Sequence, residues 1–243
     1  NVEDSVQKIL DDLRWLGLDW DEGPDRSGPY SPYVQSERIA LYENALDKLQ
    51  AANRIFPCTL SRKDLEGIAS APHGPHQETP YPAALRPKAL SAHWLERVRS
   101  GAARDSAIRF AVDEGEVSFE DLVFGFQQER VSETVGDFVV RRRDGVFAYQ
   151  LAVVVDDIAM GITEVVRGAD LLHSTGRQIQ LIDALRSDRP RYGHIPIVKN
   201  SSGEKLSKRD SALTLLALRS RGISPERVVG YLASTLALID RDE

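Results

Sequence analysis

The sequence is poor in sulfur, because Cys58 is its one cysteine and Met160 its one methionine among 243 residues. A single thiol excludes a disulfide within the chain, and it excludes zinc sites built from four cysteines or from a cysteine pair with a histidine pair. No apolar run approaches the ~20 residues that a membrane-spanning helix requires. We therefore expect a reduced, cytoplasmic protein without a membrane segment.

The sequence also lacks an excess of basic residues, since 31 Lys and Arg stand against 37 Asp and Glu, a formal net charge of -6. A strongly basic domain would indicate nucleic acid binding through counterion release, and this composition does not. A local basic stripe would be enough for such a partner, so the net charge leaves it open. The 42% hydrophobic and 28% charged residues are typical of a globular protein with a substantial core.

Apolar residues at helical spacing dominate both ends of the chain. Asn1 and Ser36 are suited to cap the first two helices, and Gly17 to end the first. Ser224-Pro225-Glu226 predicts the start of the last helix, because proline is favoured at the first helical position. The expected helices lie at residues 1–16, 36–49, 94–98, 175–185 and 213–218, and from 224 onward.

Short strands are expected in the middle of the chain, at residues 54–57, 108–112, 117–119, 138–143, 146–156, 162–166 and 195–198. Asp144-Gly145 is the clearest hairpin signal, because glycine tolerates the positive φ that such a turn requires. Residues 146–156 are predicted to form the second strand of this hairpin. Helices interleaved with buried strands favour an α/β fold, with a smaller α+β region inserted between about residues 57 and 127.

A polar loop with two lysines three residues apart follows the strand expected at 195–198. Lys205 and Lys208 flank Leu206-Ser207 just before a helix, and Gly203 offers a hinge for closure of the loop. Lysine ammonium groups supply point charges for phosphates, while loop amides and the helix N-terminus supply donors. On its own, this spacing suits a solvated surface loop as well as a phosphate site.

Residues 205–209, KLSKR, resemble the second signature (KMSKS) of class I aminoacyl-tRNA synthetases, with Leu for Met and Arg for the last Ser. Further segments resemble glutamyl-tRNA synthetases, namely residues 136–145, 149–157, 161–170 and 174–178. FAYQLA at 147–152 and QSER at 35–38 are more similar to the short paralogous family, the glutamyl-queuosine tRNA(Asp) synthetases. The resemblance covers nearly the whole chain.

This resemblance implies an α/β fold of the class I synthetase type, a Rossmann-type catalytic domain with a small inserted α+β region and C-terminal helices. The catalytic domain would take residues 1-56 and 128-209, the inserted acceptor-like region 57-127, and the C-terminal helical segment 210-243. The family's first signature (HIGH), its first strand and a glutamate-binding Arg and Glu correspond to positions upstream of Asn1. We therefore expect that part of the N-terminus to be missing from this sequence.

The activity implied by the resemblance is ATP-dependent activation of L-glutamate as glutamyl-adenylate, with Mg²⁺ bridging phosphate oxygens. In the short paralogues the glutamyl group passes to queuosine in the anticodon of tRNA(Asp). Length favours these, because only residues 210-243 follow the lysine motif, where full glutamyl-tRNA synthetases carry a large anticodon-binding region. The alternatives are a catalytic fragment of a conventional enzyme charging tRNA(Glu), and a non-catalytic nucleotide- or RNA-binding paralogue. We expect a monomer.

Tyr149 and Arg167 correspond to the family's glutamate-binding Tyr and Arg. The chemistry fits, because Arg pairs with carboxylates and a Tyr hydroxyl can orient them. Without the resemblance, Tyr149 would be interpreted as a core aromatic and Arg167 as an ion-pair partner of Asp156 or Asp157.

The resemblance also assigns the nucleotide site. Lys208 is expected to be the main catalytic contact to the ATP phosphates, assisted by Lys205 and Ser207, and Asp170 is suited to accept the ribose hydroxyls. His194 is either structural or close to the nucleotide, and the sequence does not decide between these interpretations.

Many family members hold zinc through Cys-x-Cys and a later Tyr-x-x-x-Cys. The matching positions here are Cys58, Leu60, Tyr81 and Leu85. One thiolate and one phenol cannot complete a tetrahedral site, so we predict no zinc, with both leucines packed in its place and the cysteine buried as a small hydrophobe. His73 and His76 lie between these positions and are alternative ligands, but a proline-rich surface loop favours two solvated histidines.

Overall fold

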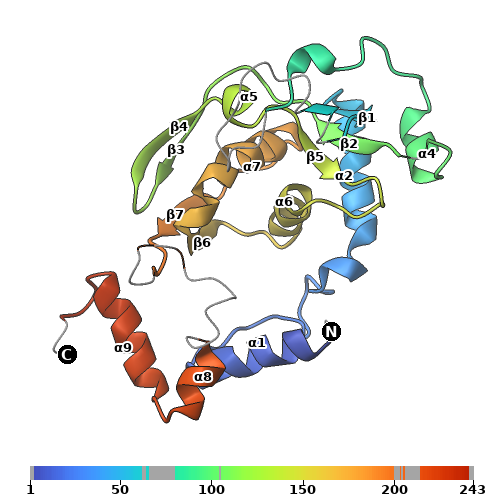
Figure 1. The fold of residues 1–243 in the computed structure, drawn as a ribbon. Helices are drawn as coiled ribbons and strands as arrows, with labels where there is room; N and C mark the ends of the chain where they lie inside the picture. Colours follow the sequence, from blue (N-terminus) through green and yellow to red (C-terminus); the bar gives the residue numbers. More distant parts are fainter. Residues whose placement is uncertain are drawn as a thin grey trace. The chain divides into compact units, whose positions relative to one another are not determined.

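The structure is a computed structural model that describes residues 3–61, 64–65, 80–103, 105–199, 203, 205 and 214–240. The chain divides into two units (Figure 1): Asn1–Ser31 with Ile195–Glu243, and Pro32–His194. No described helix is long and apolar enough to cross a membrane.

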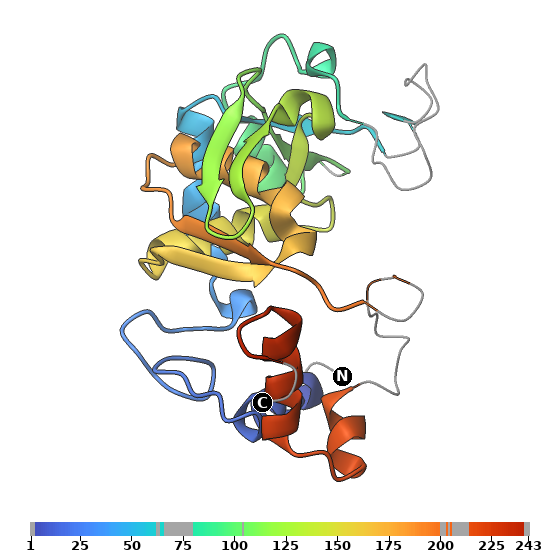
Figure 2. The same cartoon turned by 90° about the vertical axis from the view of Figure 1, so that its left-hand side faces the viewer.

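Two sheets can be traced through the described part of the larger unit. The first has the order β1-β2-β5 and is antiparallel, with β1 at Ile55–Cys58, β2 at Ala107–Phe110 and β5 at Phe138–Arg141. The second has the order β4-β3-β7-β6, with β3 at Val117–Asp121, β4 at Gly125–Glu129, β6 at Glu164–Gly168 and β7 at Arg191–Ile195. β3 pairs antiparallel with β4, a hairpin at the front of Figure 2, and parallel with β7.

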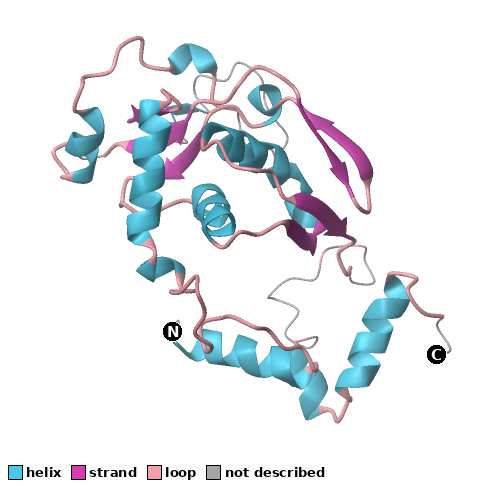
Figure 3. Ribbon diagram, turned by 180° about the vertical axis from the view of Figure 1, so that it is seen from behind, coloured by secondary structure: helices cyan, strands magenta, loops and turns pink. Residues whose placement is uncertain are grey.

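Four of the described helices contact strands of these sheets: α2 (Ile39–Ala51), α4 (Trp94–Arg99), α6 (Tyr149–Ala159) and α7 (Leu172–Ala184). The short helix α5 (Val131–Thr134) follows β4. α6 lies between α2 and α7 (Figures 1 and 3). The core gathers buried apolar side chains from these helices and strands, including Leu46, Leu49, Ile108, Phe110, Val140, Leu151, Val154, Ile179 and Leu181. The mixture of strands and covering helices confirms the predicted α/β class.

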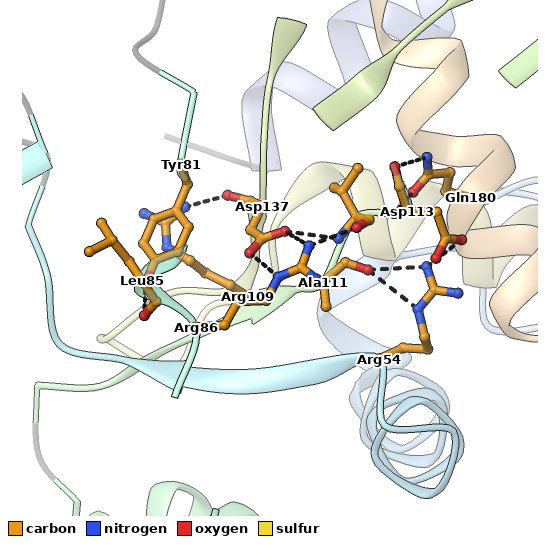
Figure 4. Close-up of polar contacts among 10 residues, drawn as sticks. Arg54, Tyr81, Leu85, Arg86, Arg109, Ala111, Asp113, Asp137 and Gln180 are labelled. Atoms are coloured by element: carbon orange, nitrogen blue, oxygen red, sulfur yellow. Dashed lines mark hydrogen bonds and ion pairs between the residues drawn. The ribbon is translucent and has the colours of Figure 1, made fainter. Parts of the chain in front are cut away.

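The inserted region is tied to the first sheet by a buried carboxylate (Figure 4). Asp137 accepts hydrogen bonds from Arg86 Nε at 2.7 Å, from Arg86 Nη2 at 2.6 Å and from the backbone N–H of Val112 at 2.9 Å. Gly136 beside it has φ of +66°, and a Cβ there would lie 2.4 Å from the backbone N and O of Tyr81. Only glycine permits this close approach of the two segments.

The described helices of the smaller unit are α1 (Glu3–Trp15), α8 (Leu215–Ser220) and α9 (Pro225–Thr235). The predicted start of α9 is confirmed, because the Ser224 side chain accepts a hydrogen bond from Arg227 N at 3.4 Å and Pro225 occupies the first turn. Gly17, with φ of +78°, follows the end of α1 as predicted.

The prediction of a strand at 146–156 is wrong, because the chain enters α6 at Tyr149. The turn itself is confirmed: Gly145 has φ of +87°, and Arg142 N donates to Val146 O at 2.8 Å. A single bridge between Arg141 and Phe147 then ends the hairpin. The valine-rich run alternates like a strand, but burial at 151, 152, 154 and 155 follows helical spacing. Packing between α2 and α7 overrides the β-propensity of its valines.

Smaller differences concern the ends of elements. Ser36 does not cap α2, because it lies in a 3₁₀ turn at Gln35–Glu37 and the helix begins after Arg38 without a side-chain cap. The strand expected at 195–198 is wrongly placed, because β7 spans Arg191–Ile195 and residues 196–198 form no strand. The sequence did not predict β4, whose Phe126 is 65% exposed and whose remaining residues are mostly polar.

Candidate functional site

Arg167 on β6 is held by the protein on one side of its guanidinium. Nε donates to Nε2 of His194 at 3.0 Å, and Nη2 donates to Thr175 Oγ1 at 3.0 Å and more weakly to the Leu171 carbonyl at 3.5 Å. The group lies over the Tyr192 ring, 5.5 Å from its centroid. Among the described residues Nη1 has no partner, so it is the donor left for a bound anion.

His194 on β7 is fully buried between Arg167 and a carboxylate. Its Nδ1 lies 2.6 Å from Oδ2 of Asp121, and neither side chain is exposed. Oδ1 of Asp121 accepts from the backbone N–H groups of Val123, Phe124 and His194 at 3.0, 3.0 and 3.2 Å. Burial alone would raise the pKa of Asp121, but the hydrogen bonds from His194 and the backbone outweigh it and hold that pKa below its usual value.

The first turn of α7 joins Arg167 to the start of α6. Thr175 bonds Arg167, and its neighbour Ser174 accepts from Gln150 Nε2 at 3.2 Å. Gln150 directly follows Tyr149, the first residue of α6, so this hydrogen bond ties the start of α6 to the first turn of α7. Tyr149 is 48% exposed, which contradicts the alternative of a core aromatic.

The other alternative for Arg167, an ion pair with an aspartate of α6, is not found among the described residues. Asp156 instead accepts from Arg38 Nε at 2.6 Å and Gln35 Nε2 at 3.0 Å, both from the QSER motif. The pKa of Asp157 is raised to about 6, because burial, helped by the Asp156 charge, outweighs the opposing charge of Arg167. Gln35 and Arg38 of the QSER motif thus anchor α6 through Asp156, which gives the motif a structural role.

The predicted nucleotide contacts are only partly described. Asp170 is exposed in the 3₁₀ turn Ala169–Leu171 that precedes α7. Lys205 is exposed, pairs with Lys199 through an isolated bridge, and belongs to the unit that does not contain Arg167. The remaining candidates lie outside the described residues: Ser207, Lys208, His73 and His76.

The predicted degenerate zinc positions form a small apolar cluster on β1. Cys58 and Tyr81 are buried there with Phe56 and Leu65, and the two leucines pack against them as predicted. The Tyr81 hydroxyl donates to the Leu85 carbonyl at 3.1 Å and lies 3.8 Å from Cys58 Sγ. No three His, Cys, Asp or Glu side chains cluster for a metal ion within the described ranges. The absence of zinc stays a prediction.

The sequence predicted Arg167 and Tyr149 as site residues, left His194 undecided, and did not indicate that Asp121 and Thr175 contact His194 and Arg167. Asp121 and His194 are separated by 73 residues and meet because β3 and β7 are neighbours in the sheet. The available signal was a strand-end aspartate before a glycine-containing turn, together with the STGRQ segment that includes Thr175.

Comparison with known proteins identifies the family. The family described as "tRNA synthetases class I (E and Q), catalytic domain" matches residues 1–236. The glutamyl-Q tRNA(Asp) synthetase of Symbiobacterium thermophilum is 49% identical over 239 residues, which are 98% of this chain and 73% of that protein. The protein of the same name from Nitratidesulfovibrio vulgaris is 46% identical, over 96% of this chain and 71% of its own length.

More distant relatives are longer. Glutamate–tRNA ligase 1 of Halorhodospira halophila is 40% identical over 95% of this chain, which spans 48% of that protein. The crystal structure of glutamate-tRNA synthetase from Elizabethkingia anophelis matches with a TM-score of 0.71 and 28% identity, over 85% of this chain and 43% of that one. The chain therefore belongs to the class I tRNA synthetases for glutamate and glutamine, with the α/β catalytic domain of an aminoacyl-tRNA synthetase-like ligase.

Proposed function

We propose that this ligase activates L-glutamate with ATP and transfers the glutamyl group to queuosine in the anticodon of tRNA(Asp). Two relatives named for tRNA(Asp) are 49% and 46% identical and are covered over 73% and 71% of their length. The glutamate–tRNA ligase at 40% identity is covered over only 48%. The higher identity to the relatives named for tRNA(Asp) favours the queuosine-directed reaction over a fragment of the conventional enzyme.

The observation that carries the glutamate site is the restrained guanidinium of Arg167. The protein fills Nε and Nη2, so a substrate carboxylate would bind through Nη1 in a charge-assisted hydrogen bond. The hydroxyl of Tyr149, a half-exposed residue at the start of α6, would orient the same substrate. The substrate is then held in one geometry before it reacts, which lowers the entropic part of the barrier.

In the activation step, an oxygen of the glutamate α-carboxylate attacks the α-phosphorus of ATP, the bond to the bridging oxygen breaks, and pyrophosphate leaves. The carboxylate is already ionised, so no protein base is needed. Lys208, assisted by Lys205 and Ser207, would stabilise the charge on the phosphates, and Asp170 would accept the ribose hydroxyls. Mg²⁺, when bound with ATP, would supply positive charge that offsets the charge of the phosphates.

We further propose the domain boundaries, the localisation and the oligomeric state of the enzyme. The catalytic domain would comprise residues 1-56 and 128-209, interrupted by an insert at 57-127 and followed by a helical segment at 210-243. The insert would hold no zinc. The enzyme would act in the cytoplasm as a monomer.

The acceptor distinguishes this function from its alternatives. Full-length protein is incubated with ATP, radiolabelled glutamate and one of three RNAs: tRNA(Asp) with queuosine, tRNA(Asp) without it, and tRNA(Glu). We expect label only on the first. Label on tRNA(Glu) would establish the conventional enzyme instead, and label on no RNA would leave a nucleotide- or RNA-binding role.

A further inference from the structure

We infer that His194 and Asp121 are positioning residues for glutamate: they fix the imidazole tautomer that accepts the Arg167 Nε–H, and so aim Nη1 at the substrate. This inference rests on the proposed role of Arg167 in binding glutamate. It concerns three side chains that all belong to the larger unit, on β3, β6 and β7.

The tautomer follows from the donors. A guanidinium donates hydrogen bonds and accepts none, so Nε2 of His194 must carry a lone pair toward Arg167 Nε at 3.0 Å. The proton is then on Nδ1, which donates to Asp121 Oδ2 at 2.6 Å. Both side chains are fully buried, so water cannot replace either contact.

The carboxylate of Asp121 cannot rotate freely. Its Oδ1 accepts from three backbone N–H groups, those of Val123, Phe124 and His194. Only Oδ2 is therefore left to face the imidazole. The backbone of the β3–β4 turn and of β7 thus determines which atom of residue 121 meets His194.

This geometry makes Asp121→Asn a specific perturbation. The amide oxygen must stay with the three N–H donors, so the NH₂ group takes the place of Oδ2 and points a hydrogen at Nδ1 of His194. That contact selects the opposite tautomer, with the proton on Nε2. Nε2–H then faces the Nε–H of Arg167, so these two donors can no longer bond each other, and the acceptor left near Nε2 is the Thr175 hydroxyl oxygen at 3.3 Å. The guanidinium loses the contact that fixes its Nε, while Nη2 keeps Thr175, and the side-chain volume at residue 121 is nearly unchanged.

We expect Asp121→Asn to raise the KM for glutamate about 10- to 100-fold, because a hydrogen bond to a charged group is lost. The KM for ATP should change by about twofold or less, since the perturbation acts through Arg167 alone. The assay is glutamate-dependent ATP–pyrophosphate exchange on the full-length enzyme.

Two variants of His194 separate positioning from simple packing. His194→Gln keeps an acceptor near the position of Nε2, whereas His194→Asn keeps a donor toward Asp121 and does not reach Arg167. We expect the KM for glutamate to stay near that of the wild type in the first variant and to rise in the second. Combined with Asp121→Asn, His194→Gln should restore most of the lost affinity, because the amide can turn its oxygen to Arg167.

The tautomer of His194 can be measured directly, from the ¹⁵N chemical shifts of histidine-labelled enzyme. The inference requires the proton on Nδ1 in the wild type and on Nε2 in Asp121→Asn. A wild-type proton on Nε2 would overturn it, and so would equal KM increases in His194→Gln and His194→Asn that track their thermal stability. Arg167→Gln separates the two proposals. If that variant binds glutamate normally, the proposed glutamate site fails; if it does not, but Asp121→Asn does, only the positioning role fails.

Discussion

The buried ion pair between Arg38 and Asp156 should dominate the attachment of α6 to α2. The Arg38 side chain is 2% exposed and that of Asp156 11%, with Nε and Oδ1 2.6 Å apart. Asp156→Asn removes the charge while it retains the shape. Breaking a buried pair by removing one partner costs about 3–5 kcal/mol, and the amide oxygen still accepts one hydrogen bond. We therefore expect a loss of about 3 kcal/mol in the free energy of unfolding.

The chain offers a matched control in the pair Arg189–Asp183. Its N–O distance is also 2.6 Å, but the side chains are 45% and 44% exposed. Exposed pairs contribute about 0–1 kcal/mol, so Asp183→Asn should change the unfolding free energy by no more than that. Urea unfolding followed by circular dichroism measures both variants. Equal losses at the two sites would refute the reasoning that burial, and not the N–O distance, sets the cost.

Three further predictions concern the site. Tyr149→Phe should raise the KM for glutamate about tenfold while the free energy of unfolding changes by less than about 0.5 kcal/mol, because the side chain is 48% exposed; a parallel loss of stability would contradict this. Lys208→Ala should lower the rate of glutamyl-adenylate formation far more than it weakens glutamate binding, as measured by single-turnover kinetics against equilibrium binding. Equal losses would contradict its phosphate role. The pKa of Asp157 is raised by burial to about 6, so its ionisation between about pH 4 and 6 destabilises the folded state. Asp157→Asn should therefore be more stable than the wild type at pH 7.5, by only about 1 kcal/mol because partial exposure screens the charge. The difference should be smaller at pH 4.5, because Asp157 is then mostly protonated in the folded wild type. Urea unfolding at both pH values tests the sign.

Local sequence signals predicted the structure correctly where a single short segment determines the conformation. Ser224-Pro225 predicted the start of α9, and Asp144-Gly145 predicted the turn after β5. The valine-rich run after that turn misled, because its burial on α6 depends on α2 and α7, which lie far away along the chain. Periodicity alone cannot distinguish a fully buried helix from a buried strand.

The residues of the site likewise divide into those that local motifs predict and those that only the tertiary structure identifies. Arg167 and Tyr149 were predicted because short motifs around them resemble the family. Asp121 was not, since nothing in its own segment indicates that β3 will pair with β7 and bring it to His194. The residues that hold a functional side chain in place come from distant segments, and here the order of the strands in the sheet brings them together.

Glutamate activation by the full-length enzyme tests the central claim most directly. ATP–pyrophosphate exchange is measured with glutamate, first without RNA and then with tRNA. The resemblance implies that conventional glutamyl-tRNA synthetases activate glutamate only with tRNA, so the proposed function predicts exchange in its absence, and a large loss of that exchange in Arg167→Gln. Exchange that appears only with tRNA(Glu), or none under either condition, would contradict it.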